Sequence, residues 1–230
     1  MEGKHLGFFT EFPTKEGEDV EMKVGISFVD MEGAANNFKQ EIASKNFDQV
    51  KKEANELWNK ELSRIQISGG TDDEKTIFYT ALYHTMIDPR IYTDVDGRYI
   101  GGDYKVHTSD STFTKHTIFS GWDVFRSQFP LQTIINPGLV SDELNSLISM
   151  ADQSGREYYE RWEFLNSYSG CMLGNPALSV LADAYVKGIR TYDAEKAYKY
   201  AVNTSCRFGN DSLGYTPGVL SISHLSLIHI

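Results

Sequence analysis

Apolar and polar residues alternate over residues 20–29, VEMKVGISFV, near the start of the chain. Every second position from Val20 to Phe28 is apolar, and most positions between them are polar or small. Successive side chains of a strand point to opposite faces, so this period of two predicts a half-buried β-strand. Because an isolated pair of strands is only marginally stable, we expect the segment to need a larger sheet.

From residue 31 onward the apolar residues follow a helical period. A first short helix is followed by an amphipathic stripe from Phe47 to Ile65, which predicts a longer one. Thr71 and Glu74 have the spacing of a capping box, which predicts the start of a third helix that Pro89 ends.

After an irregular stretch at residues 90–119, the helical pattern resumes. Ser120 and Asp123 indicate the start of a helix toward Ile135, which Pro130 should kink or divide. Three further helices are expected to begin near Asp142, Asn175 and Asp193. One strand remnant followed by seven helices predicts a mainly α array of antiparallel helix pairs.

The charge balance excludes some classes of partner. Twenty-two basic and 32 acidic residues give a net charge of −10, so the chain lacks the basic surface that nucleic acid requires. No apolar run approaches the roughly 20 residues that span a bilayer, and no secretion signal is visible. We therefore expect neither nucleic-acid binding nor membrane insertion.

Common metal and nucleotide motifs are missing from the sequence. The six histidines show no zinc-ligand spacing, and no GxxxxGK[ST], GxGxxG or GxSxG motif occurs. Residues 94–97, DVDG, resemble part of a calcium loop, but the remaining positions do not fit an EF-hand. We interpret them as a turn.

Two clusters of tryptophan and charged residues stand out. In the first, Asp123 and Arg126 are three residues apart, as in an ordinary helical ion pair. The alternative is a sugar site, in which the ring of Trp122 covers the C–H face of a pyranose and Asp123 accepts hydrogen bonds from its hydroxyls. The residues by themselves leave both interpretations open.

The second cluster is Glu160-Arg161-Trp162-Glu163. It could be a solvated group of charges around one aromatic ring. It could also form the opposite wall of the same pocket, with Arg161 donating hydrogen bonds to hydroxyl oxygens. The occurrence of two such clusters favours the sugar site more than either does alone.

Several longer segments resemble glycoside hydrolase family 92, the bacterial, calcium-dependent, exo-acting α-mannosidases. The resemblance extends from residue 18 to about residue 218 and is carried by five motifs in the order of the family. These motifs are TIFYTALYHTMIDPR at 76–90, DGRYIGGD at 96–103, FSGWDVFRSQFPL at 119–131, RWEF at 161–164 and GCMLGNPALSVLADAYVKGI at 170–189.

The resemblance implies a mainly α fold: a partial (α/α)6 toroid preceded by a helical linker and the last strands of a β-sandwich. Residues 1–30 would end the sandwich domain, 31–68 would form the linker and 69–218 would form the first part of the catalytic domain. Residues 219–230, VLSISHLSLIHI, lack helical or strand patterning, and we expect them to be a non-native tail.

The implied activity is removal of terminal α-linked mannose from N-glycan or mannan-type glycans, with α-1,2 linkages expected. The mechanism would be inverting, with one carboxylic acid protonating the leaving oxygen and one carboxylate activating water. The resemblance also implies that calcium assists the hydrolysis and that the protein is periplasmic or extracellular.

Transferred by motif, Trp122, Asp123, Arg161, Trp162 and Glu163 are the expected substrate-binding residues. The motifs of the family that carry the general acid, the general base and the calcium ligands do not occur in these 230 residues. We therefore expect no catalytic residue and no metal ligand here, and an inactive fragment.

Two other functions are open. The same helical frame could belong to a non-catalytic carbohydrate-binding or scaffold protein. It could also belong to a six-hairpin glycosidase with another sugar preference, since a fold alone does not select a substrate.

Overall fold

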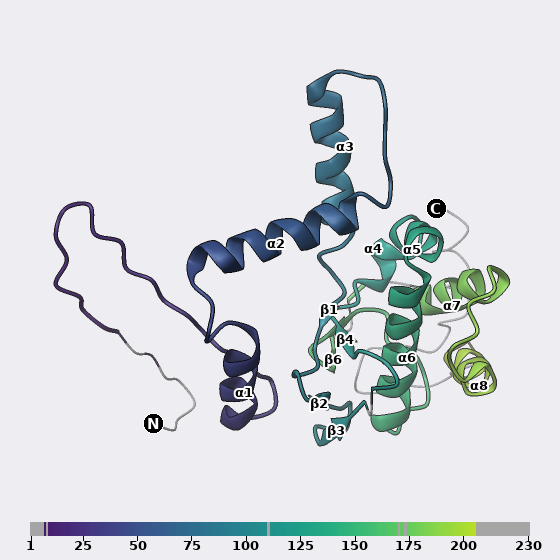
Figure 1. The fold of residues 1–230 in the computed structure, drawn as a ribbon. Helices are drawn as coiled ribbons and strands as arrows, with labels where there is room; N and C mark the ends of the chain where they lie inside the picture. The colour runs from purple at the N-terminus through teal and green to yellow at the C-terminus, as the bar shows by residue number, and fades with distance from the viewer. Residues whose placement is uncertain (1–6, 8, 110, 170, 173, 206–230) are drawn as a thin grey trace.

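The computed structural model describes residues 7, 9–109, 111–169, 171–172 and 174–205. Within these residues it contains eight α-helices and six short strands (Figure 1). The helices are α1 (Met31–Glu41), α2 (Phe47–Leu62), α3 (Asp72–His84), α4 (Gly121–Val124), α5 (Gln128–Ile135), α6 (Pro137–Gln153), α7 (Pro176–Val186) and α8 (Ala194–Ser205). The strands are β1 (Arg90–Ile91), β2 (Arg98–Ile100), β3 (Val106–Thr108), β4 (His116–Thr117), β5 (Glu163–Phe164) and β6 (Ser167–Tyr168). The expectation of a mainly α fold is confirmed.

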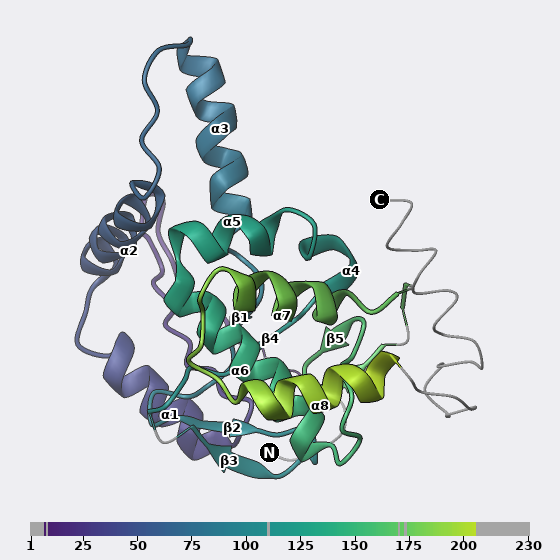
Figure 2. The same cartoon turned by 90° about the vertical axis from the view of Figure 1, so that its right-hand side faces the viewer.

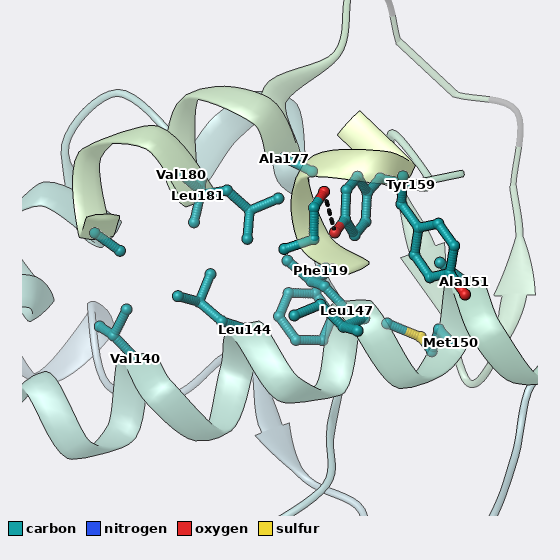
Figure 3. Packing of buried hydrophobic residues seen from close by; sticks show 14 of the residues in the cluster. Phe119, Val140, Leu144, Leu147, Met150, Ala151, Tyr159, Ala177, Val180 and Leu181 are labelled. Carbon is teal, nitrogen blue, oxygen red and sulfur yellow. Dashed lines mark hydrogen bonds between the residues drawn. The ribbon is translucent and has the colours of Figure 1, made fainter. Parts of the chain in front are cut away.

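Helix α6 is at the centre of the core and packs against α5, α7 and α8 (Figure 2). Its residues Val140 and Leu144 are fully buried, as is Ala184 of α7. The hydroxyl of Tyr159 donates a 3.1 Å hydrogen bond to the Ala197 carbonyl inside this cluster (Figure 3). Burial of this continuous apolar surface is the main force that holds α5 to α8 together.

Helices α2 and α3 extend away from this core (Figure 1). They contact each other through the rings of Trp58 and Tyr83, whose centroids are 4.5 Å apart. Arg64 donates a 3.0 Å hydrogen bond to the Ile135 carbonyl at the end of α5. Helix α2 has no buried residue, so most of its predicted apolar stripe is exposed.

The expected capping box of α3 is present. The Thr71 hydroxyl accepts from the Glu74 amide, and the Glu74 carboxylate accepts from the Thr71 amide. Each side chain thereby satisfies a backbone N–H that has no partner within the helix. The start of this helix is set locally by its own sequence.

Two helix boundaries differ from the sequence prediction. The helix expected from Ser120 to Ile135 is divided, as Pro130 indicated, but the break lies at residues 125–127 and Pro130 itself lies within the first turn of α5. Proline is tolerated there because first-turn amides need no intrahelical acceptor. Pro137 is the first residue of α6, where its missing N–H is likewise tolerated. The helix therefore begins about one turn before the start that Asp142 predicted.

The stretch of residues 90–119 is irregular only in part. Strand β1 pairs antiparallel with β4, and β2 pairs antiparallel with β3. The 94–97 segment forms the expected turn, closed by a 2.9 Å bond from the Gly97 amide to the Asp94 carbonyl. Gly97 has a φ of +82°, a conformation that favours glycine.

The predicted strand over residues 20–29 is wrong, because these residues form no strand among those described. The apolar side of the alternation is exposed, whereas Gly25 and Ser27 are half-buried against α1. A Cβ atom on Gly25 would lie 2.5 Å from the Ala34 carbonyl oxygen, so only glycine allows this approach. Residues 219–230 lie outside the described residues.

Candidate functional site

The two tryptophan clusters meet through one backbone pairing. Phe119 and Glu163 form an isolated antiparallel bridge, with N–H···O distances of 3.1 Å and 3.0 Å. Phe119 lies three residues before Trp122 of the first cluster, and Glu163 ends the second. The bridge therefore joins segments that are more than forty residues apart in the sequence.

Gly121 lies close to the second cluster. A Cβ atom at this position would be 2.5 Å from the Arg161 carbonyl oxygen and 2.9 Å from Cγ of Pro176. Glycine is needed here for close approach, since α4, the 161–163 segment and the start of α7 all converge on it. The first residue of α4 is thus in direct contact with the backbone of Arg161.

The first cluster is partly exposed. Asp123 is exposed and accepts a hydrogen bond from the Ser120 hydroxyl, while Trp122 is half-buried. The guanidinium carbon of Arg126 lies 4.3 Å from the Trp122 ring centroid, and its Nη2 donates to the Trp122 carbonyl at 3.2 Å. Arg126 therefore contacts Trp122 by a cation–π interaction, and the ion pair with Asp123, one of the two interpretations of this cluster, is not formed within the described residues.

The second cluster is more buried than a solvated charge cluster would be. Arg161 is 8% exposed and donates from Nη1 to the Met172 carbonyl at 2.6 Å. Trp162 is half-buried and stacks on Phe164, with ring centroids 6.3 Å apart and an angle of 24° between the rings. The interpretation of this cluster as freely solvated charges is wrong for Arg161 and Glu163.

Glu163 is 1% exposed, and its carboxylate accepts three hydrogen bonds from other described residues. The donors are the Thr117 hydroxyl at 2.7 Å, the backbone amide of Ile118 at 2.8 Å and the backbone amide of Asn166. A buried carboxylate is tolerated when several donors compensate the loss of water. This residue connects β4, the bridge and the β5–β6 turn.

Lys115 is a buried residue that sequence reasoning did not identify. Its Nζ atom donates to the Ser146 carbonyl at 3.0 Å and lies 5.9 Å from the Tyr99 ring centroid. Burial lowers the pKa of Lys115 to about 7, against the opposing effect of the Glu163 charge. Thr117 and Asn166 were also missed, because their spacing from Glu163 has no regular pattern.

Asn175 is a second buried group close to these segments. It directly precedes α7, is 3% exposed, and its Oδ1 atom has no hydrogen-bond partner among the described residues. The sequence indicated only the helix start. That start is confirmed, although the Asn175 side chain makes no cap hydrogen bond.

The described residues include no group of three or more histidine, cysteine, aspartate or glutamate side chains placed to hold a metal ion. Among the same residues, no helix combines the length and apolar character needed to cross a membrane.

Comparison with known families gives one extended match. Residues 33–219 match the model of the glycosyl hydrolase family 92 catalytic domain. The match includes both tryptophan clusters and the bridge between them. It also includes α1 to α8 apart from the first two residues of α1.

Solved structures of that family are similar to the chain. A family 92 α-mannosidase of Bacteroides thetaiotaomicron is 33% identical, with a TM-score of 0.75 over 81% of this chain and 25% of its own. A family 92 inverting mannosidase of the same bacterium is also 33% identical, with a TM-score of 0.74 over 80% of this chain and 25% of its own. The chain spans about a quarter of the length of these relatives.

A curated relative comes from the fungus Arthroderma benhamiae. It is described as an uncharacterized secreted glycosidase and is 37% identical over 79 residues. That match covers 32% of this chain and 10% of the relative.

Proposed function

The chain belongs to glycosyl hydrolase family 92, and from this we propose that it forms the part of an α-mannosidase that binds the terminal mannose of a glycan. The observation that carries the proposal is the Phe119–Glu163 bridge, which joins the two tryptophan clusters. Two segments with sugar-binding residue types thereby lie side by side, as a single binding site requires.

We assign sugar contact to four side chains. The exposed carboxylate of Asp123 suits two adjacent hydroxyls of one sugar, and the half-buried Trp122 offers an apolar ring. Since Arg126 lies over one side of that ring, the sugar would use the other side. Arg161 and Trp162 would form the opposing wall, with Glu163 beneath it.

The proposed reaction is hydrolysis of terminal α-linked mannose, α-1,2 linkages included, with inversion at the anomeric carbon. In this proposal the chain's own residues bind and orient the sugar. Proton transfer is assigned to groups outside the described residues. Calcium, which the family resemblance implies, is likewise assigned to ligands outside them.

The proposed architecture is the first part of an (α/α)6 toroid over residues 69–218, preceded by a linker at 31–68 and the end of a β-sandwich at 1–30. The packing of α5 to α8 on one another supports the toroid. We also propose a periplasmic or extracellular location, which the secreted fungal relative supports.

The test is binding of mannoimidazole, a ligand of one solved relative, to the native gene product that carries this chain. Loss of a charged hydrogen-bond partner in Asp123→Ala should weaken binding by roughly 100-fold. The exposed Asp19→Ala serves as the control and should bind normally. Equal affinity in wild type and Asp123→Ala would exclude this site.

Measurements of hydrolytic activity distinguish the proposed function from its two alternatives. A non-catalytic carbohydrate-binding protein would bind mannoimidazole through Asp123 but release no mannose from α-linked mannobioses. An enzyme with another sugar preference would release a different monosaccharide from the corresponding disaccharide.

A further inference from the structure

Three residues around the Glu163 carboxylate have a left-handed backbone, and none is glycine. They are Ile118 with φ +66°, Leu165 with φ +50° and Asn166 with φ +64°. This region is unfavourable for side chains with a Cβ atom, and most of all for a β-branched residue such as Ile118. Such conformations persist where the surrounding contacts impose them, and they concentrate at functional sites.

Leu165 and Asn166 are the two turn residues between β5 and β6, and the backbone amides of all three residues converge on one carboxylate and one hydroxyl. The amide of Ile118 donates to Oε2 of Glu163 at 2.8 Å, and the amide of Asn166 donates to Oε1. The amide of Leu165 donates to Thr117 Oγ1 at 3.1 Å, and that hydroxyl donates to Oε1 of Glu163 at 2.7 Å. The backbone amides of all three residues are thus satisfied by Glu163 and Thr117.

The segments held in this way lead directly to the proposed sugar contacts. Ile118 precedes Phe119 of the bridge, and Gly121 at the start of α4 lies against the Arg161 carbonyl. On the other side, Glu163 itself follows Trp162. A shift in the backbone at residues 117–119 would therefore move Asp123 relative to Arg161.

We propose that Glu163 is a positioning residue, which sets the geometry between the 119–123 and 161–163 segments without touching the sugar. This inference rests on the proposed function and deepens it. Its basis is that the carboxylate is 1% exposed and both of its oxygens already accept hydrogen bonds from the protein.

The chemistry of the donors explains why a carboxylate is required. A glutamine at this position has only one acceptor oxygen, and its NH2 group is a donor. If that oxygen kept the bonds from Thr117 and Asn166, the NH2 group would face the Ile118 amide, which is also a donor. The strained backbone at residue 118 would then lose its acceptor.

The experiment compares Glu163→Gln, Thr117→Val and the double variant in the native gene product, with the exposed Glu195→Gln as control. One measurement is hydrogen exchange by mass spectrometry on peptides spanning residues 117–121 and 161–166. The other is the affinity for mannoimidazole. A further variant, Thr117→Ser, keeps the hydroxyl and should behave as wild type.

We expect faster exchange in both peptides for Glu163→Gln and Thr117→Val, and a roughly 10- to 100-fold loss of affinity. The double variant should lose little more than Glu163→Gln alone, because both changes break the same hydrogen-bond network. Glu195→Gln should leave both measurements unchanged.

Three results would overturn the inference. Weaker binding in Glu163→Gln with normal binding in Thr117→Val would indicate direct sugar contact. Faster exchange with unchanged affinity would indicate a purely structural role, and unchanged exchange in Glu163→Gln would exclude the positioning effect itself. Failure of the wild type to bind mannoimidazole would instead overturn the proposed function, while the exchange data would still decide whether Glu163 holds the two segments.

Discussion

Gly121 lies so close to Arg161 that a Cβ atom at residue 121 would be 2.5 Å from the Arg161 carbonyl oxygen. The neighbouring atom is backbone, which cannot turn away as a flexible side chain can. Residue 121 directly precedes Trp122, and residue 161 directly precedes Trp162. The two tryptophan clusters can therefore approach this closely only because residue 121 has no side chain.

Gly121→Ala should destabilise the protein and separate these segments. Overpacking at a rigid contact costs about 1–3 kcal/mol, and we expect a decrease of that size in the free energy of unfolding measured in urea. Gly138→Ala is the control, because a Cβ atom at residue 138 in α6 would meet nothing within 4 Å. That change should stabilise the helix by about 0.5–1 kcal/mol. Equal effects of the two substitutions would contradict the close contact.

Lys115 should make stability depend on pH near neutrality. Its folded-state pKa of about 7 lies below the unfolded value of about 10.4. Between these two pH values the folded protein therefore binds fewer protons than the unfolded protein. The free energy of unfolding should therefore rise from pH 7 toward pH 10, and this stability is lost as the pH falls through 7. Lys115→Met should reduce the slope, whereas the exposed Lys105→Met should not. Parallel urea-unfolding curves for wild type and Lys115→Met across this range would disprove the prediction.

Glu143 should have the opposite effect. Burial raises its pKa well above the ordinary value, and the neighbouring Asp142 charge adds to the shift. The folded protein therefore keeps the proton to higher pH, and stability decreases as the pH rises above about 4.5. Glu143→Gln should match wild type near pH 4 and have a higher free energy of unfolding than wild type at pH 8. The exposed Glu21→Gln is the control, and a variant that is less stable at pH 8 would argue against a buried neutral carboxyl group.

Asp94 should hold the N-terminal segment and α1 against the rest of the molecule. Its buried carboxylate accepts a 2.7 Å hydrogen bond from Ser27 and a 2.8 Å hydrogen bond from Asn37. Asp94→Ala leaves both donors without this acceptor, so α1 should open more often. Trypsin cleavage after Lys39 should then become about tenfold faster. Asp96→Ala, which removes a more exposed carboxylate two residues away, should change the rate little.

The helices could be predicted from the sequence to the extent that their signals are local. The capping box of α3 and the Asn175-Pro176 start of α7 act within one turn, and they define helix starts in the structure. Pro130 signals that the helix from Ser120 is interrupted, but no local signal fixes the break at residues 125–127. It accompanies the approach of Gly121 to Arg161, which is a contact across forty residues.

The strand expected at residues 20–29 shows the limit of periodicity. Alternation records which side chains share a face, but a strand also requires a neighbouring strand with which to form hydrogen bonds. Among the described residues this segment has none. It packs instead through Gly25 and Ser27, so the side of the segment that the alternation predicted to be buried is exposed.

The sequence by itself determined the mainly helical class, most helix starts and the two clusters of tryptophan with charged residues, because these depend on neighbours along the chain. Only the tertiary structure decided that the clusters adjoin, that Arg161 and Glu163 are buried, and that Lys115 and Thr117 belong to the same region. Burial and hydrogen bonding between distant segments depend on how the helices pack. That packing is a sum of many weak contacts for which no single motif is a signal.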